Sequence, residues 1–436
     1  MTLHIDADVT VPGDKSLTHR ALMFAAAATG ESRLRGLLPG EDCRSTASVL
    51  RSLGVSIPEL PRDGSELGMS SRGIKQWRAP TEILDCGNSG TTARLMMGFL
   101  AGRPFCATLT GDASLRSRPM RRITDPLTQM GTRVTEHERA DRLPIELCGG
   151  QLKSLHYRSP KGSAQIKSAV LLAGLSAGVE VSVWEPIRSR DHSERMLVDL
   201  GIELIEEERE GGWYVHTLPP AGALPGLDMD VPGDPSSAAF LVALAALGSS
   251  GELRVRGVGI NPTRMGFFAA LRAMGVDVRV ENERVSGGEP IGDIVAAPGT
   301  LRAISVGGAE VPAMIDEIPV LACLAARAEG ETRITGADEL RAKESDRIKA
   351  IVENLQGLGV EAEELSDGLV VRGSDRPLRG SIRALHDHRI AMAFGILGAL
   401  PENDISIDTP DVVDVSFPGF WDAIGGLSGA AGQGAR

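Results

Sequence analysis

Residues 11–30 read VPGDKSLTHRALMFAAAATG, and residues 231–248 read VPGDPSSAAFLVALAALG. In both segments the same four residues precede a helix-length run that is apolar over most of its circumference, as is typical of a buried helix. Such a repeat indicates an internal duplication, which decides the fold before any single motif does. Only the first copy carries Lys15, His19 and Arg20. The two copies therefore share a scaffold and differ in their chemistry.

Four further segments have the same character: they begin with polar residues, continue with small apolar ones and end near a glycine or proline. The six predicted buried helices are SLTHRALMFAAAATG from Ser16, NSGTTARLMMGFLAG from Asn88, SAQIKSAVLLAGLSAG from Ser163, SSAAFLVALAALGSSG from Ser236, DEIPVLACLAARAEG from Asp316 and DHRIAMAFGILGALP from Asp387. A second class of helix alternates with them, amphipathic and closed by a glycine before β-branched residues. The closing glycines are Gly54, Gly131, Gly201, Gly275, Gly359 and Gly425.

Short β-like runs such as ATLTG, VSVWE, LRVRG and TRITG separate the helices. The repeating unit is a strand, a buried helix, a strand, a surface helix and a strand or hairpin, made six times. We therefore predict an α/β fold of two similar domains of three repeats each, residues 12–229 and residues 1–11 plus 230–436. The first residues would complete the second domain, and residues 426–436 would be a disordered tail. One large α/β domain with coincidental alanine-rich helices is the alternative.

The composition excludes several classes of function. The 436 residues carry a formal net charge of −12, which argues against a nucleic-acid-binding surface. Small anions stay possible, because a few clustered bases make a local positive pocket. The N-terminus resembles no signal peptide, and no apolar run is long enough to span a membrane. We expect a cytoplasmic protein without membrane or nucleic-acid partners, and a monomer.

The five cysteines are scattered along the chain and form no C-x-x-C pair. They are Cys43, Cys86, Cys106, Cys148 and Cys323. This spacing favours reduced core residues over a disulfide framework or a zinc site.

The starts of the buried helices are the best candidates for chemistry. A helix N-terminus offers free N–H donors and a partial positive charge, so it binds anions. An ordinary N-cap is the simpler interpretation for any single residue there. Basic residues gather at most of these ends, however, while the Ser236 copy lacks them. They are Lys15, Arg20, Arg94, Arg118, Lys161, Lys167, Arg190, Lys343, Arg347 and Arg389.

Other motifs fail. GDKS lacks the upstream glycine of a phosphate-binding P-loop, and no G-x-S-x-G nucleophile elbow occurs. HDHR at residues 386–389 has no evident third metal ligand, so we expect no metal site there.

Taken together and in order, the motifs resemble those of the 5-enolpyruvylshikimate-3-phosphate synthase family. They are VPGDKSLTHRAL, GNSGTTAR, TGDASLRSRPM, GSAQIKSAVLLAGL, RSRDHSERML, MIDEIPVLA, ELRAKESDRI, HDHRIAMAF and SFPGFWD. The match extends from Val11 to about Ile424, and the stretches KSAVLLAGL and RDHSERML are most similar to the class II bacterial branch.

This resemblance implies two domains of βαβαββ-type repeats with the active-site cleft between them. It also implies transfer of the enolpyruvyl group of phosphoenolpyruvate to the 5-hydroxyl of shikimate 3-phosphate, with release of phosphate, on the pathway to aromatic amino acids. Acid–base groups and cations suffice for this addition and elimination, so we expect no metal and no cofactor. Glyphosate would occupy the phosphoenolpyruvate site beside Gly90.

The resemblance also implies individual roles. The contacts to shikimate 3-phosphate would be Lys15, Ser16, Arg20, Ser163, Ala164, Gln165, Arg190, Asp316 and Lys343. The contacts to phosphoenolpyruvate would be Lys15, Asn88, Gly90, Arg118, Gln165, Arg347 and Arg389. The catalytic residues would be Lys15, Asp316 as the base at the 5-hydroxyl and Glu344 as the proton donor to the methylene carbon.

Two positions depart from the family pattern. Ala164 stands where some relatives have a second serine, and Val415 where some have a lysine. Two alternatives stay open: a UDP-N-acetylglucosamine enolpyruvyl transferase and a non-catalytic anion-binding relative. The first usually has a reactive cysteine where this chain has Ala113, and the second would not need Lys15, Asp316 and Glu344 together.

Overall fold

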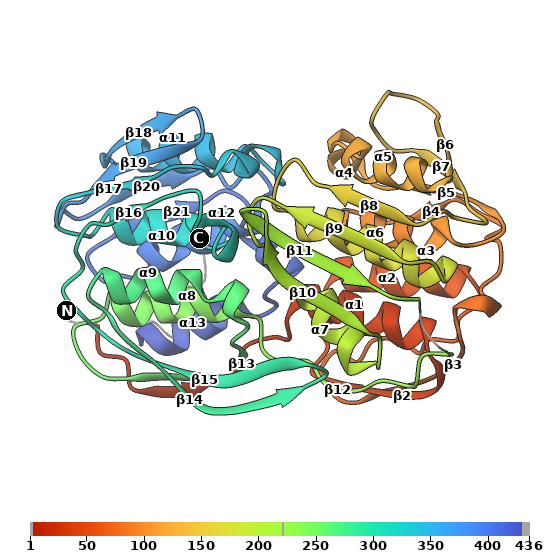
Figure 1. The fold of residues 1–436 in the computed structure, drawn as a ribbon. Coiled ribbons are helices and arrows are strands. Elements are labelled where there is room, and N and C mark those ends of the chain that lie inside the picture. The colour runs from red at the N-terminus through yellow and green to blue at the C-terminus, as the bar shows by residue number, and fades with distance from the viewer. Residues whose placement is uncertain (1–2, 220–221, 430–436) are drawn as a thin grey trace. The chain divides into compact units, whose positions relative to one another are not determined.

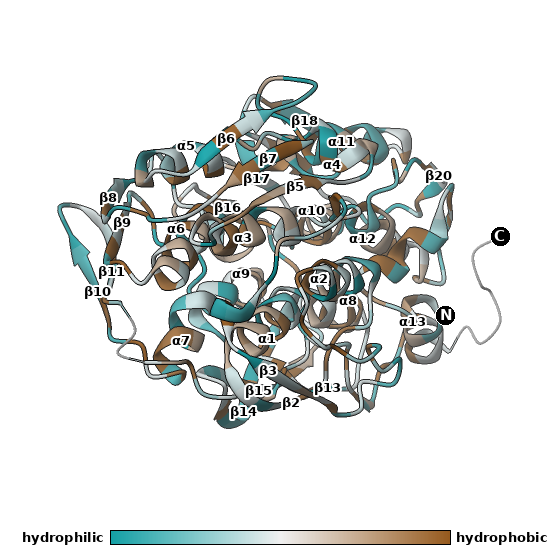
Figure 2. Cartoon of the chain, turned by 90° about the vertical axis from the view of Figure 1, so that its right-hand side faces the viewer, coloured by the Kyte–Doolittle hydropathy of each residue, from teal (hydrophilic) through white to brown (hydrophobic). Residues whose placement is uncertain are grey.

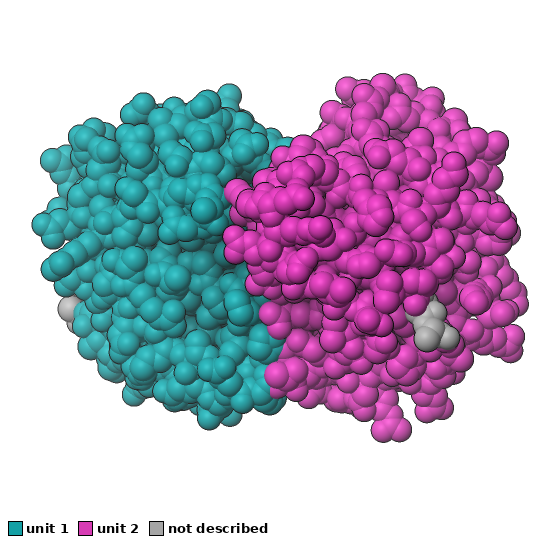
Figure 3. Space-filling model, in the orientation of Figure 1, with its two compact units in different colours: residues 1–12, 232–284, 290–436 teal, residues 13–231, 285–289 magenta. Residues whose placement is uncertain are grey.

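The computed structural model describes residues 3–219 and 222–429. The chain divides into two compact units, each with its own hydrophobic core (Figure 3). Unit 1 comprises residues 1–12, 232–284 and 290–436, and unit 2 comprises residues 13–231 and 285–289. We keep the domain limits drawn from the sequence as a prediction, because compactness alone does not show that each unit folds by itself.

The chain passes from one unit to the other inside each VPGD segment, after Pro12 and after Val231. A short strand precedes each crossing and pairs with a strand of the unit that the chain is about to leave. The strand β1 (Ala7–Val9) pairs in parallel with β13 (Leu253–Gly259) of unit 1. The strand β12 (Asp228–Asp230) pairs in parallel with β2 (Thr29–Arg35) of unit 2. The duplicated sequence thus marks the two places where the chain leaves one sheet and enters the other unit.

All six predicted buried helices are present (Figure 1). They are α1 (Lys15–Ala27), α3 (Gly90–Ala101), α6 (Ala164–Ala177), α8 (Pro235–Ala246), α10 (Ile318–Ala325) and α12 (His388–Gly398). Every residue of α8 is buried. Helices α3 and α6 pack side by side in unit 2, and hydrophobic residues run along both (Figure 2). They approach so closely that a Cβ on Gly98 would lie 2.4 Å from the carbonyl oxygen of Ala169.

The six surface helices are also present, with a short helix α4 (Ala113–Ser117) between two of them. They are α2 (Glu41–Ser52), α5 (Arg121–Met130), α7 (His192–Asp199), α9 (Gly266–Ala273), α11 (Arg347–Gly357) and α13 (Phe420–Ser428).

The end predicted at Gly425 is wrong, because α13 continues to Ser428 and is followed by Gly429 in the left-handed conformation. Burial of Ile424 and Leu427 in the core of unit 1 explains the extension. The predicted disordered tail therefore differs from the structure at residues 426–428, and residues 430–436 lie outside the described part of the chain.

Six small sheets accompany the helices in the described residues. Four of them have one parallel pair followed by two antiparallel strands. In unit 2, one of these sheets has the order β4 (Leu84–Asp85), β5 (Cys106–Thr110), β7 (Ile145–Cys148), β6 (Arg133–Glu136), and another has the order β8 (Leu155–Arg158), β9 (Val181–Glu185), β11 (Gly212–Thr217), β10 (Leu204–Arg209). In unit 1, one has the order β16 (Ser305–Val306), β17 (Glu331–Ile334), β19 (Gly368–Arg372), β18 (Glu361–Leu365). The fourth has the order β1, β13, β15 (Glu289–Ala297), β14 (Asp277–Ser286). The other two are β12, β2, β3 (Leu67–Arg72) and β20 (Arg379–Ile382), β21 (Asp404–Ile407).

A buried helix connects the two parallel strands in four of these sheets, as in β4–α3–β5 and β16–α10–β17. In the remaining two sheets one strand of the parallel pair is β1 or β12, the strands that precede the two crossings. The predicted α/β class and the alternation of two kinds of helix are confirmed. The part of the chain described here contains no helix with both the length and the apolar character needed to cross a bilayer.

The expectation that all five cysteines are reduced core residues is wrong for two of them. Cys43, Cys86 and Cys323 are buried and free, but Cys106 and Cys148 form a disulfide. The two are direct partners in the antiparallel register of β5 and β7. Their 42-residue separation gave no sign of this, because the pairing follows from strand register.

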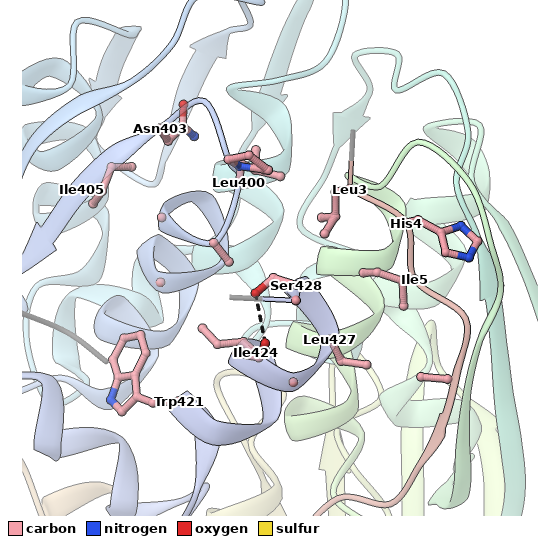
Figure 4. A pocket seen from close by; sticks show the side chains of 18 of the residues that line it. Leu3, His4, Ile5, Leu400, Asn403, Ile405, Trp421, Ile424, Leu427 and Ser428 are labelled. Carbon is pink, nitrogen blue, oxygen red and sulfur yellow. Dashed lines mark hydrogen bonds between the residues drawn. The ribbon is translucent and has the colours of Figure 1, made fainter. Parts of the chain in front are cut away.

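Unit 1 contains a cavity of about 850 Å³ beside the N-terminal segment and α13 (Figure 4). Its apolar lining includes Leu3, Ile5, Trp421, Ile424 and Leu427. None of the site residues predicted from the sequence lines this cavity. The candidate site is therefore sought at the starts of the buried helices.

Candidate active site

In unit 2, Lys15 is the first residue of α1. The side chain of Asp14 caps this helix by accepting a hydrogen bond from the backbone N–H of Leu17 at 2.8 Å. The ammonium group of Lys15 forms an ion pair with Asp42 on α2. A cation at a helix N-terminus adds to the partial positive charge already there, so this end suits an anion.

Arg20 lies one turn further along α1 and is buried. Its guanidinium donates to Oγ of Ser193 at 2.8 Å, to Oγ of Ser168 at 3.2 Å and to the carbonyl oxygen of Ser16 at 3.0 Å. These contacts come from α1, α6 and α7, so three helices fix the orientation of one guanidinium. Arg190 lies half-buried just before α7.

A chain of hydroxyl groups connects α1 with the start of α3. Nδ1 of the buried His19 lies 2.7 Å from Oγ1 of Thr46, which lies 2.6 Å from Oγ1 of Thr92. Thr92 donates in turn to Oγ of Ser89, the N-cap of α3, at 2.7 Å. Burial lowers the pKa of His19 to about 3, so the ring is neutral near pH 7. His19 is therefore a packing and positioning group rather than an additional cation.

Arg118 directly follows α4 and contacts Asn88 in the loop before α3. The guanidinium of Arg118 donates to Oδ1 of Asn88 at 2.7 Å and to Oγ of Ser114 at 3.0 Å. Asn88 donates from Nδ2 to Asp112 at 2.7 Å. Sequence reasoning missed Asp112, although it directly precedes α4 in TGDASLRSRPM.

Gly90 begins α3 next to two guanidinium groups. A Cβ placed on Gly90 would lie 2.8 Å from Nη1 of Arg94 and 3.5 Å from Nη1 of Arg118. The same Nη1 of Arg94 donates to Oε1 of Gln165 at 2.9 Å. The absence of a side chain at Gly90 thus leaves room for an ordered arginine.

The start of α6 brings the SAQ segment beside α3. Gln165 donates from Nε2 to Oγ1 of Thr91 at 3.4 Å, and Ala164 is the first residue of the helix. Ser163 offers its hydroxyl at this end, while its backbone N–H donates to Oε2 of Glu185 at 3.2 Å. As expected, any contact from Ala164 to a ligand would have to come from its backbone.

Below this end lies a buried ion triad that sequence reasoning did not anticipate. Nζ of Lys167 is 2.8 Å from Oε1 of Glu185 and 2.7 Å from Oε1 of Glu194, and all three side chains are at most 2% exposed. Burial opposes the charge of Lys167, but the two glutamates outweigh it and raise the pKa of the lysine. Lys167 is therefore a structural cation and not a ligand contact.

In unit 1, three cations surround the carboxyl group of Asp316. Oδ1 of Asp316 lies 3.3 Å from Nζ of Lys343, 3.5 Å from Nη1 of Arg347 and 3.9 Å from Nε of Arg389. Nη1 of Arg389 also donates to the backbone carbonyl of Asp316 at 3.2 Å. The structure therefore brings together four residues that are far apart in the sequence.

Arg347 is the buried centre of this group. Its guanidinium binds Asp387, the N-cap of α12, through Nε at 2.8 Å and Nη2 at 3.1 Å. Nη2 also donates to Oε2 of Glu344 at 2.6 Å. Burial disfavours the charged arginine, yet Asp387, Glu344 and Asp316 together raise its pKa. The buried carboxylate of Asp387 and the partly exposed carboxylate of Glu344 fix the guanidinium before any ligand arrives.

The second VPGD copy has a base after all, supplied from another element. Nη2 of the buried Arg264, in the turn of 3₁₀ helix Pro262–Arg264, donates to Oγ of Ser236 at 2.8 Å and to Asp234 at 3.3 Å. Oε1 of Glu317 lies 3.7 Å from the same nitrogen. The interpretation that this end lacks a base is wrong, but its charge is balanced by acids inside the fold. The base comes from the segment NPTR at residues 261–264, which lies outside the repeat, so the repeat alone did not indicate it.

The predicted residues thus form two groups, one in each unit. The group of unit 2 contains Lys15, Ser16, Arg20, Asn88, Gly90, Arg118, Ser163, Ala164, Gln165 and Arg190. The group of unit 1 contains Asp316, Lys343, Glu344, Arg347 and Arg389. Asp42, Asp112, Asp387 and Arg94 hold these groups in place through the contacts given above.

Comparison with known proteins gives one consistent result. The family model for "EPSP synthase (3-phosphoshikimate 1-carboxyvinyltransferase)" matches residues 2–424. A 3-phosphoshikimate 1-carboxyvinyltransferase from Desulfitobacterium hafniense is 47% identical over 421 residues, covering 96% of this chain and 95% of that protein. The structure of an EPSP synthase from Acinetobacter baumannii matches with a TM-score of 0.85 at 40% identity, covering 98% and 96% of the two chains. The enolpyruvyl transferase NikO from Streptomyces tendae, 18% identical with a TM-score of 0.75 and 98% and 95% coverage, shares the fold.

The buried state of His19 predicts a pH-dependent stability. The pKa is about 3 in the folded protein and about 6.5 in the unfolded chain, so only the unfolded chain takes up this proton as the pH falls between these values. Stability from this source is complete above pH 6.5 and decreases toward pH 3. A His19→Gln variant should show a shallower decrease of the melting temperature across this window. His137→Gln, at an exposed position, is the control and should follow the wild type. Parallel curves for His19→Gln and the wild type would contradict the assignment.

Proposed function

The chain belongs to the EPSP synthase family, and on this premise we propose which of its residues hold the substrates and which move protons. The protein is a 1-carboxyvinyl transferase: it transfers the enolpyruvyl group of phosphoenolpyruvate to the 5-hydroxyl of shikimate 3-phosphate and releases phosphate, in the shikimate pathway. The observation that carries our assignment is the carboxyl group of Asp316, held among Lys343, Arg347 and Arg389 with Glu344 beside them.

We assign the two groups as follows. The residues proposed to bind shikimate 3-phosphate are Lys15, Ser16, Arg20, Ser163, Ala164, Gln165 and Arg190 of unit 2 and Asp316 and Lys343 of unit 1. The residues proposed to bind phosphoenolpyruvate are Lys15, Asn88, Gly90, Arg118 and Gln165 of unit 2 and Arg347 and Arg389 of unit 1. Both substrates are anions, and fixed arginines favour bidentate binding of phosphate and carboxylate groups.

Asp316 is the proposed base at the 5-hydroxyl. When the carboxylate accepts the hydroxyl proton, the three cations around it lose the negative charge of Asp316, although Arg347 keeps its ion pair with Asp387. Their positive charge is then available to the anionic adduct that forms at the same moment. Charges that are oriented before the reaction stabilise a transition state without the cost of reorganisation. The surroundings of Asp316 thus support both the proton transfer and the stabilisation of the adduct.

Glu344 is the proposed proton donor to the methylene carbon of phosphoenolpyruvate. Its contact with Arg347 places it next to a proposed phosphoenolpyruvate ligand. In the elimination step the carboxylate of Glu344 would take a proton back from the methyl carbon, and the proton held by Asp316 would pass to the leaving phosphate. A different interpretation is that Glu344 only orients Arg347, and kinetics can separate the two roles.

We also propose that the chain acts as a cytoplasmic monomer, an assignment that rests on the family resemblance. Its measured mass in solution would test the monomer.

The substrate is tested directly by phosphate release. With phosphoenolpyruvate present, we expect release on addition of shikimate 3-phosphate and none on addition of UDP-N-acetylglucosamine. An Asp316→Asn variant is the control for contaminating phosphatase and should release almost none. Release with the nucleotide sugar would contradict the assignment, and release with neither would support a non-catalytic relative.

The role of Glu344 is tested by Glu344→Gln, which keeps the shape and can still accept a hydrogen bond from Arg347. Loss of a general acid lowers the rate by about 10²–10⁴-fold, so kcat should fall by that factor while the KM for shikimate 3-phosphate stays nearly constant. Glu353→Gln on the exposed face of α11 is the matched control. A raised KM for phosphoenolpyruvate at normal kcat would mean instead that Glu344 only orients Arg347.

The size of the residue at position 90 should decide inhibition by glyphosate. An alanine here would place its Cβ 2.8 Å from Nη1 of Arg94 and would displace that side chain, and glyphosate, which is longer than phosphoenolpyruvate, needs the space at this position more. We expect a sensitive wild-type enzyme and, for Gly90→Ala, a larger rise in the inhibition constant than in the KM for phosphoenolpyruvate. Gly68→Ala, where a Cβ meets open space, is the control. Wild-type activity at glyphosate concentrations far above the KM would contradict this argument.

A further inference from the structure

The disulfide between Cys106 and Cys148 lies on the outer face of the sheet β4–β5–β7–β6 in unit 2. Side chains alternate between the faces of a strand, and along β5 the buried residues are Ala107 and Leu109. Cys106 therefore points away from the core and is exposed, and Cys148 is half-buried. A small molecule or a protein thiol can reach this bond from solvent.

Two charged side chains stand next to the sulfur of Cys148. Nη2 of Arg133, on the neighbouring strand β6, lies 3.2 Å from this sulfur. Oε1 of Glu146 lies further away, at 3.8 Å. A nearby guanidinium stabilises a thiolate, and a sulfur that leaves as a stabilised thiolate leaves faster. The two sulfurs are thus unequal: one is open to attack and the other is prepared to leave.

The three other cysteines are not open to attack from solvent. Cys43, Cys86 and Cys323 are buried. Burial raises the pKa values of Cys86 and Cys323, so these thiols resist deprotonation. Reactivity toward thiols is therefore confined to one pair, which allows it to be measured without removing the others.

We propose that Cys106–Cys148 is a reversible redox site, reduced by thiol–disulfide exchange with an external dithiol. A thiolate of the dithiol attacks Sγ of Cys106, the S–S bond breaks, and its electron pair passes to Sγ of Cys148, which leaves as a thiolate beside Arg133. The second thiolate of the dithiol then attacks its own sulfur in the mixed disulfide and releases Cys106. The dithiol becomes a disulfide, two electrons reach the protein, and two protons complete the thiols.

The segment between the two cysteines includes α4, α5 and β6. The disulfide restrains this segment in the unfolded chain, which is how such bonds usually stabilise proteins. Reduction should therefore lower the melting temperature by about 5 °C or more while leaving the fold intact. The proposal is independent of the substrate assignment, because neither cysteine is among the proposed ligands.

The test uses the full chain, equilibrated with oxidised glutathione, then treated or not treated with dithiothreitol and labelled with N-ethylmaleimide without denaturant. A chelator is present, because two sulfurs and the carboxylate of Glu146 lie within 4.8 Å of one another and could retain a metal ion after reduction. Intact-mass spectrometry should find no label before reduction and two labels after it, and peptide mapping should place these labels on Cys106 and Cys148. Two labels before reduction, or none afterwards, would overturn the proposal.

Variants test the mechanism of the exchange. After treatment with dithiothreitol, Cys106→Ser and Cys148→Ser should each take one label instead of two. Arg133→Met should slow reduction several-fold, because the leaving thiolate loses its counter-charge. Arg139→Met, an exposed arginine in the following loop, is the matched control and should reduce at the wild-type rate. Equal rates for Arg133→Met and the wild type would remove the proposed role of the guanidinium.

Discussion

Complete burial of a helix restricts where that helix can carry charge. The six central helices are surrounded by apolar contacts over most of their length, and α8 is buried at every residue. Polar side chains are tolerated mainly in the first turn, where free N–H groups need partners and the helix dipole favours anions. The candidate ligands Lys15, Gly90 and Gln165 lie at such starts for this reason. The position of the chemistry is thus a consequence of how the core is built.

The same constraint requires that buried cations be paired inside the protein. Arg347 binds Asp387, and Arg264, which lies outside the second VPGD copy, contacts Asp234 of that copy and Glu317. Removing one partner of such a pair leaves a buried charge, which typically costs about 3–5 kcal/mol. The paired arginines therefore keep one orientation. In unit 1 this fixed orientation also determines the position of Asp316, because Asp316 contacts Arg347, which is itself held by Asp387.

The sequence predicted the regular part of the structure well, because a buried helix and an amphipathic one have different apolar patterns. It could also connect Lys15, Asp316 and Glu344 with a reaction, through motifs rather than through spacing. It failed where the outcome depends on which strands become neighbours. The pairing of Cys106 with Cys148 follows from the register of β5 and β7, which no local pattern records. The partner of the second VPGD segment, Arg264, is likewise brought there by the fold.

The continuation of α13 past Gly425 is an intermediate case. A glycine before apolar residues is a common end signal, yet burial of Leu427 outweighs the cost of a glycine inside the helix.

The buried triad of Lys167, Glu185 and Glu194 limits the paths that evolution can take through this part of the sequence. Replacing the lysine alone would strand two carboxylates in the core, and replacing one glutamate alone would remove one of the two ion pairs that hold the ammonium group. An apolar residue at position 167 becomes acceptable only when the glutamates change as well. Substitutions at these three positions are therefore expected to arise together, so that lineages differ by whole sets and intermediates are selected against.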